Sequence, residues 1–133
     1  TIGQAVTLNE GSDVSIFCTG HLVWKSIEAA RELEARGISV DLINIHTIKP
    51  LDDDAVLASA RKTRRVVVAE EHQKLGGLGG SVAELLAEHQ PTPMRFVAVN
   101  DSFGESGTPD ELMAKYGIDT PDVVRAVESV LEA

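Results

Sequence analysis

Chemically versatile side chains cluster after a Val-rich run in the middle of the chain. Glu70, Glu71 and His72 follow Val66–Ala69, and the glycine-rich run Gly76–Gly80 comes next. Carboxylate and imidazole groups are suitable metal ligands. A glycine-rich turn at a helix N-terminus offers backbone N–H groups to an anion such as phosphate. Whether either kind of site exists depends on the spacing of these residues.

The glycine run fits neither of two common phosphate-binding motifs. A dinucleotide fingerprint needs glycine at the position of Val82, and a P-loop needs a lysine before Ser or Thr. Glu70 and Glu71 also place negative charge beside any phosphate bound there. We therefore expect these glycines to allow close packing of backbone, with binding of a small anion at Gly76–Ser81 as the alternative.

A metal site and a catalytic serine are also disfavoured. No pair of the histidines and acids has the local spacing of metal ligands, so they converge only if the fold brings them together. Ser106 lies in Gly104–Gly107, which is one residue short of a nucleophile elbow. Cys18 lies in an apolar run and is interpreted as a small buried hydrophobe.

Strand-like and helical patterns alternate along the chain. Residues 5–8 and 14–18 are strand-like and are separated by turn-forming residues, which predicts an antiparallel pair at a sheet edge. Further strands are predicted at 38–45, 66–69 and 94–99, with 66–69 as a central strand buried on both faces. Helices are predicted from His21 to Gly37, from Asp52 to about Lys62, from about Ser81 to Pro91, over 108–117, and from Thr120 onward.

Apolar residues at helical spacing indicate which face of each helix packs on the sheet. The residues on these stripes are Val23, Ile27, Ala30 and Leu33 in the first helix, Val82, Leu85, Leu86 and His89 in the third, and Val123, Val127, Val130 and Leu131 in the last.

Strands that alternate with helices predict parallel neighbours and a doubly wound, three-layer α/β/α fold. Ligands of such folds bind at the carboxyl ends of the strands. The polar residues expected at that edge are His21, His46, Glu70, Glu71, His72, Asp101 and Ser102, and Gly77 and Gly79 are further candidates for a ligand or an interface.

The composition is that of one folded domain. The chain has 133 residues, 43% hydrophobic and 25% charged, and a formal net charge of -9. This charge opposes binding to nucleic acid or to an anionic membrane surface. A single cysteine excludes an intrachain disulfide and favours a cytoplasmic setting. Because the chain starts at Thr1, we expect it to be part of a longer one or of a split subunit.

Several stretches in order resemble the C-terminal domain of transketolase. The first is Ile48–Asp52, and the second is Val68–His72 with Gly76–Gly79. The third is Ser106-Gly107 with Pro109, Glu111-Leu112 and Tyr116–Asp119, and the matching region runs from about Val6 to Leu131. Related domains occur in 1-deoxyxylulose-5-phosphate synthase and in the beta subunits of 2-oxo acid dehydrogenase E1 components.

The resemblance implies a mostly parallel sheet of five strands with one antiparallel edge strand. It also implies a role in two-carbon ketol transfer between sugar phosphates, as in the pentose phosphate pathway, by an enzyme that uses thiamin diphosphate and a divalent cation, Mg or Ca. In that family the diphosphate-binding and pyrimidine-binding domains lie upstream, and the enzyme is a homodimer. Those cofactor motifs have no counterpart here, so we expect no catalytic, cofactor-binding or metal-binding residue and no activity of the isolated domain.

Three functional hypotheses follow. The first is a transketolase C-terminal domain, residues 1–133, that supports subunit assembly at a dimer interface, with the synthase as the alternative branch. The second is a stand-alone regulatory module that binds a small anion. The third is docking of another enzyme component, which the E1 relatives suggest, and the acidic surface favours a basic partner.

Overall fold

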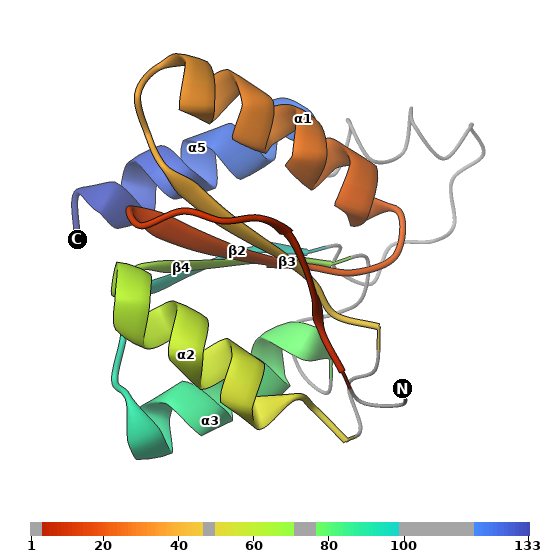
Figure 1. The fold of residues 1–133 in the computed structure, drawn as a ribbon, viewed down its shortest axis with the longest axis vertical. Coiled ribbons are helices and arrows are strands. Elements are labelled where there is room, and N and C mark those ends of the chain that lie inside the picture. The colour runs from red at the N-terminus through yellow and green to blue at the C-terminus, as the bar shows by residue number, and fades with distance from the viewer. Residues whose placement is uncertain (1–3, 47–49, 71–76, 99–118) are drawn as a thin grey trace.

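The computed structural model describes residues 4–46, 50–70, 77–98 and 119–133. These form one five-stranded sheet between two layers of helices, which confirms the three-layer α/β/α prediction (Figure 1). The strands are β1 (Val6–Asn9), β2 (Val14–Cys18), β3 (Val40–Asn44), β4 (Val66–Glu70) and β5 (Met94–Ala98). The helices are α1 (Leu22–Ala35), α2 (Asp53–Thr63), α3 (Leu78–His89) and α5 (Thr120–Leu131). The helix predicted over 108–117 lies outside the described residues.

The strand order is β1-β3-β2-β4-β5, and only β1 is antiparallel to its neighbour. The sequence correctly predicts an antiparallel strand at one edge. The predicted pairing of β1 with β2 is wrong, because β1 pairs with β3. β4 is an interior strand between β2 and β5 and is buried along its whole length, which confirms the prediction for residues 66–69.

The segment between β1 and β2 explains this pairing, because it crosses the amino end of β3 instead of forming a hairpin. The Asn9 side-chain amide donates to the Val40 carbonyl oxygen at 2.8 Å, and the backbone N–H of Asp13 donates to Ser39. Gly11 lies so close to Val40 that a Cβ there would be 2.3 Å from the Val40 carbonyl carbon. Glycine is therefore needed at the crossing.

Each face of the sheet carries its own hydrophobic core. On one side α1 and α5 pack over residues such as Ile16, Leu42 and Val67. On the other side α2 and α3 pack over residues such as Phe17 and Val68. Neighbouring strand residues point to opposite faces, so an interior strand buried on both sides reads as a continuous apolar run.

The buried faces of the helices differ in part from the predicted stripes. In α1 the buried positions are Leu22, Ser26, Ala29, Ala30 and Leu33, whereas Val23 and Ile27 are only partly buried beside them. In α3 the buried positions are Leu78, Gly79, Val82 and Leu86; His89 is exposed, and Leu85 is partly buried. In α5 they are Val123, Val124, Val127 and Val130, with Leu131 partly buried. The predicted faces differ from the observed ones where a small or polar residue packs closest to the sheet. The apolar pattern does not identify such residues.

Local signals fix the helix ends. The Asp52 carboxylate accepts a hydrogen bond from the Ala55 N–H at the start of α2, and Arg61 and Lys62 lie in its last turn, where cations are favoured. Gly37 follows α1 with a φ of 83°, as predicted for a glycine that ends a helix. Asp119 caps α5 in a capping box with Asp122. None of the described helices has the length and apolarity of a membrane span.

Candidate functional site

The carboxyl edge of the sheet is only partly within the described residues. His21 is exposed just before α1, and His46 is exposed shortly after β3. Because β2 and β3 are parallel, with Cys18 opposite Asn44, these two histidines follow strand ends at the same edge, as predicted. His72, Asp101 and Ser102, together with Glu71, lie outside the described residues.

Glu70, the last residue of β4, lies at this edge and binds the N-terminus of α3. Its side chain is buried, with 1% exposure, and both carboxylate oxygens are engaged. The backbone N–H of Leu78 donates to Oε2 at 2.6 Å, and that of Gly79 donates to Oε1 at 2.8 Å. The positive end of the helix dipole also stabilises the carboxylate.

This contact bears directly on the phosphate hypothesis. The N–H groups that would hold an anion at the start of α3 already donate to Glu70, so the protein supplies its own anion. Gly79 is buried, and a Cβ there would lie 2.9 Å from Cδ1 of Phe96 and 3.2 Å from Oε1 of Glu70. Gly77, also buried, is the residue before the first helical turn. The geometry at Gly79 therefore favours the close-packing interpretation.

Cys18 at the end of β2 is buried, as predicted. Burial raises the pKa of its thiol to about 12, because the ionised form is poorly solvated, and the nearby Ser26 hydroxyl offsets part of that rise. Its Sγ lies 3.5 Å from the Ile43 carbonyl oxygen. A neutral, enclosed thiol of this kind is not a nucleophile.

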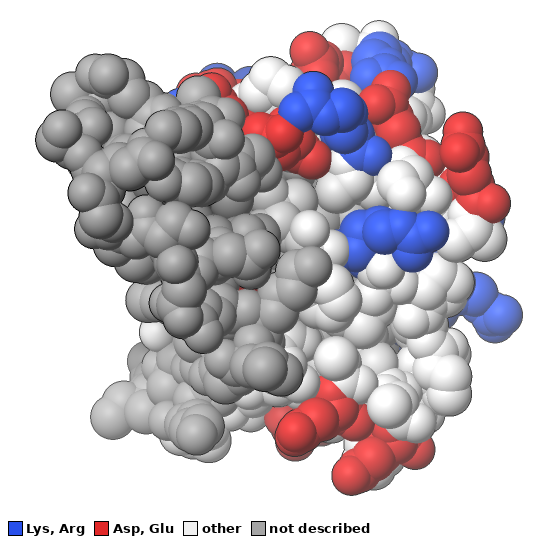
Figure 2. Space-filling view, turned by 180° about the vertical axis from the view of Figure 1, so that it is seen from behind, with Lys and Arg blue, Asp and Glu red and all other residues white. Residues whose placement is uncertain are grey.

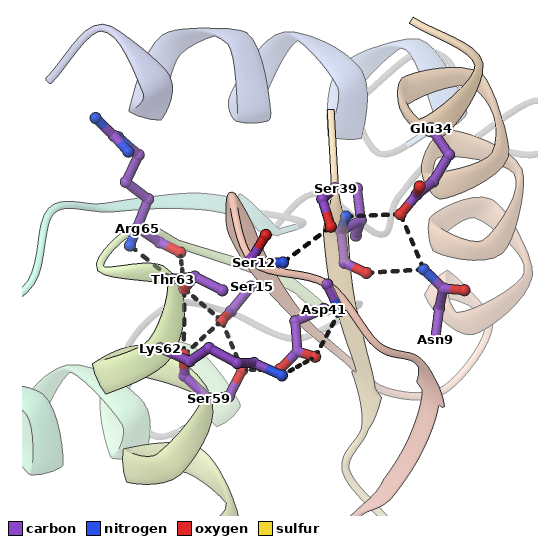
Figure 3. Close-up of polar contacts among 12 residues, drawn as sticks. Asn9, Ser12, Ser15, Glu34, Ser39, Asp41, Ser59, Lys62, Thr63 and Arg65 are labelled. Carbon is purple, nitrogen blue, oxygen red and sulfur yellow. Dashed lines mark hydrogen bonds and ion pairs between the residues drawn. The ribbon is translucent and has the colours of Figure 1, made fainter. Parts of the chain in front are cut away.

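A buried polar cluster lies at the opposite, amino edge of the sheet, on the α2 side (Figure 3). Asp41 of β3 accepts a hydrogen bond from the Ser59 hydroxyl at 2.5 Å and one from the Gly11 N–H at 3.0 Å. The Lys62 ammonium pairs at 2.8 Å with Oδ1, the carboxylate oxygen that also accepts from Gly11, whereas Ser59 donates to Oδ2. Ser15 of β2 shares hydrogen bonds of 2.6 Å with Ser59 and 2.7 Å with Thr63.

Sequence reasoning missed this cluster, although a signal was present. Asp41 and Ser15 interrupt otherwise apolar strands, and buried polar side chains require partners. Asp, Ser and Lys together resemble catalytic groups, but Ser15, Asp41 and Ser59 have exposures of 3% or less, so no substrate reaches them. The cluster instead fastens α2 to the amino ends of β2 and β3.

Among the described residues, a hollow with a volume of about 260 Å³ lies between the start of α2 and the outer side of α3. Its lining residues are Leu51, Asp53, Ser81, Glu84, Leu85 and Glu88. Figure 2 shows acidic side chains gathered over α3, whereas acidic and basic side chains are interleaved over α5. Within the described ranges, no group of three His, Cys, Asp or Glu is placed to hold a metal ion.

Comparison with known proteins assigns the chain to a family. The family model of the transketolase C-terminal domain matches residues 3–123. The 6-deoxy-6-sulfo-D-fructose transketolase subunit SqwH of Clostridium sp. (strain MSTE9) is 47% identical over 132 residues, which are 99% of this chain and 41% of that protein. The 1-deoxy-D-xylulose-5-phosphate synthase of Desulforudis audaxviator is 38% identical over 96% of this chain and 20% of its own length.

Solved structures agree with the assignment. A structure described as a split gene transketolase, inactive beta4 tetramer, superimposes with a TM-score of 0.93 at 47% identity, over 98% of this chain and 43% of its own. Transketolase from Leishmania mexicana shares the fold, with a TM-score of 0.71 at 18% identity, over 98% of this chain and 18% of its own. The chain thus spans less than half the length of each of these relatives. It belongs to the transketolase C-terminal domain family.

Proposed function

We propose that this chain is the C-terminal domain of a thiamin-diphosphate-dependent transketolase and supports the assembly of that enzyme without carrying its cofactor. The likeness to a transketolase subunit over 99% of this chain, but only 41% of the relative, carries the proposal. The upstream diphosphate-binding and pyrimidine-binding domains, or a separate subunit that contains them, are the proposed partners.

The chemistry of the described residues is consistent with this division of labour. Thiamin diphosphate would supply an electron sink for the two-carbon unit, and the enzyme would need a site for its diphosphate and divalent cation. The start of α3 does not fit a diphosphate, since its first N–H donors bind Glu70. The cofactors are accordingly assigned to the rest of the enzyme.

The synthase branch is the second candidate, because 1-deoxy-D-xylulose-5-phosphate synthases are 38% and 40% identical to nearly the whole chain. Assay of the complete enzyme distinguishes the branches. Transfer of a ketol unit from xylulose 5-phosphate or from 6-deoxy-6-sulfo-D-fructose to an aldose phosphate supports transketolase, whereas formation of 1-deoxy-D-xylulose 5-phosphate supports the synthase.

The assembly role is tested by removing residues 1–133 from the longer subunit. We expect the shortened subunit to lose association with its partners, measured by sedimentation, and to lose ketol transfer with it. A shortened subunit that assembles and turns over at the full rate contradicts the proposal.

A small-anion site remains testable in its own right. Titration of the 133-residue chain with phosphate and sugar phosphates, followed by calorimetry, is expected to show no binding at millimolar ligand, because Glu70 occupies the helix N-terminus. Saturable binding that Gly79→Ala removes would establish the regulatory-module hypothesis instead.

A further inference from the structure

The turn between α2 and β4 concentrates positive charge on an acidic chain. Four of the chain's 12 lysines and arginines lie within residues 61–65, and no acid occurs between Asp54 and Glu70. The chain as a whole has a formal net charge of -9, so this stretch has the sign opposite to that of the molecule. A concentration of one sign of charge attracts ligands of the other sign.

Among the described residues, only one cation of this stretch has an acidic partner. The Lys62 ammonium pairs with the Asp41 carboxylate at 2.8 Å. The other three cations are Arg61, Arg64 and Arg65, and within the described ranges their guanidinium groups form no ion pair and no hydrogen bond. We call these three arginines the basic turn.

Arg64 shows that the backbone does not require this charge. It is the C-cap of α2 and has a φ of 63°, which makes it the only described residue other than glycine with a positive φ. This left-handed conformation suits glycine best, and Gly37 adopts it after α1 with a φ of 83°. A glycine would therefore serve the fold at least as well at residue 64, and the arginine adds a cation to the surface.

The basic turn is open to solvent at the amino edge of the sheet. Arg61 and Arg64 are exposed, and Arg65 is partly exposed. Val66 packs on the α2 side of the sheet, so the preceding Arg65 side chain points to the α5 side. Figure 3 shows this side chain extending away from the Asp41 cluster.

The positive surface continues from the turn onto the neighbouring strand. Arg95 of β5 lies opposite Val67, whose side chain packs on the α5 side, and Nε of Arg95 donates to the Ser129 hydroxyl of α5 at 2.9 Å. Arg95 therefore shares the α5 side with Arg65. In Figure 2 basic side chains occupy the middle of the face, between acidic side chains above and below.

The N-terminal end of the described chain lies at the other edge of the sheet. Val6 pairs with Asn44 at the carboxyl end of β3, whereas Ser15 pairs with Val66 at the amino ends of β2 and β4, next to Arg65 (Figure 1). A domain that precedes residue 1 joins the chain at the carboxyl edge, so it need not cover the basic turn.

We propose that the basic turn docks an acidic segment of a separate protein, one with several aspartates or glutamates in a short run. The inference goes beyond the proposed function and does not depend on it. Guanidinium groups form paired, charge-assisted hydrogen bonds with carboxylates. Because a single exposed ion pair contributes little, the segment needs several carboxylates that bind the three arginines together.

The charge around the turn disfavours a longer anion. A nucleic acid strand would extend past five residues onto the surrounding acidic surface, where a chain with net charge -9 repels it. A single phosphate group is too small to contact all three arginines. A short acidic peptide matches the size of the turn and ends where the positive charge ends.

Binding of a labelled acidic peptide tests the proposal. A fluorescein-labelled peptide of alternating aspartate and glycine, about 10 residues long, spans up to about 30 Å and is longer than the turn. It is titrated with the 133-residue chain and with the complete enzyme, and fluorescence anisotropy is recorded. Saturable binding to both is expected, with a dissociation constant between about 10 μM and 1 mM at low ionic strength. Raising NaCl from about 50 to 500 mM is expected to weaken it at least fivefold, because exposed charges are screened.

Two double variants with the same change of net charge locate the contact. Arg61→Gln with Arg64→Gly removes two cations of the basic turn and is expected to weaken peptide binding at least about fivefold. Thermal stability is expected not to fall, because glycine relieves the left-handed conformation at residue 64. Arg31→Gln with Arg125→Gln removes two exposed cations of α1 and α5 and is expected to leave binding within about twofold.

Four outcomes overturn the inference. The first is no saturable binding up to about 1 mM, the upper limit for a weak contact. The second is equal weakening by the two double variants. The third is tighter binding of a single-stranded oligonucleotide of the same charge, which would make the turn a nucleic-acid contact. The fourth is binding by the 133-residue chain but not by the complete enzyme, which would show that another domain covers the turn. None of them alters ketol transfer by the complete enzyme, so the proposed function is tested separately.

Discussion

Replacing Glu70 by glutamine tests the hydrogen bonds that its carboxylate accepts at the N-terminus of α3, because the two side chains have almost the same shape. The native carboxylate accepts two backbone hydrogen bonds, from Leu78 at 2.6 Å and Gly79 at 2.8 Å. A glutamine side chain has one oxygen and one NH₂ group, so whichever way it turns, one backbone N–H faces another donor. The side chain is 1% exposed, so water does not replace the lost acceptor.

The expected loss of stability follows from these contacts. A buried donor left without an acceptor costs about 1–3 kcal/mol, and the bond that remains loses its ionic character, worth about another 1 kcal/mol. The sum is a decrease of about 2–4 kcal/mol in the free energy of unfolding. Glu84→Gln removes the same charge from an exposed position of the same helix and is expected to change stability by less than about 0.5 kcal/mol.

Urea denaturation followed by circular dichroism measures both variants at neutral pH. A Glu70→Gln protein whose free energy of unfolding lies within about 0.5 kcal/mol of the parent, the margin expected for surface changes, would show that Glu70 does not hold the start of α3. It would mean that the two N–H groups have other acceptors, and the helix N-terminus would again be available to an external anion.

Three further predictions concern other described residues. Lys62→Met leaves the Asp41 carboxylate without its cation. Because the Lys62 side chain is 45% exposed, the expected loss of stability is about 1–3 kcal/mol, which is less than for a fully buried pair. Arg61→Met is the control, and equal losses of the two variants in urea denaturation would contradict this prediction. Gly79→Ala forces a Cβ against Phe96 and is expected to destabilise by about 1–3 kcal/mol in the same assay, whereas a neutral effect would show that Phe96 moves freely. The raised pKa of Cys18 means that its stabilising effect is complete below pH 9, the ordinary pKa of the thiol, and is lost as the pH rises toward 12. By pH 11 the loss is expected to be about 3 kcal/mol relative to Cys18→Ala, and parallel stability profiles of the two proteins between pH 8 and 11 would disprove the burial of the thiol.

Much of the architecture is readable from local patterns. The local signals are the Val-rich run 66–69, Asp52, Gly37 and Thr120 at the start of α5. Each acts within a few residues and places its element correctly. The sheet order is different, because it depends on contacts between distant residues. Asn9–Asp13 has the composition of a turn, yet it crosses β3, and only the close approach of Gly11 to Val40 decides that.

At the candidate site, too, local patterns are readable from the sequence, whereas contacts between distant residues are not. Glu70 and Gly79 are recognisable as candidates from the sequence. The sequence cannot show that the Glu70 carboxylate accepts a hydrogen bond from Gly79 at the N-terminus of α3. The Asp41 cluster joins residues 15, 41 and 59, which no local motif connects. The sequence therefore identifies residues that could bind a ligand, and only the fold shows whether they already have hydrogen-bond partners within the protein.

We propose that this domain supports the assembly of an enzyme whose catalytic residues lie in its other domains. The most direct measurement is turnover of xylulose 5-phosphate with ribose 5-phosphate by the 133-residue chain alone, with thiamin diphosphate and Mg²⁺ present and the complete enzyme as the positive control. The complete enzyme is expected to be fully active, and the isolated chain is expected to show no turnover above the rate without protein. Ketol transfer by the isolated chain would contradict it.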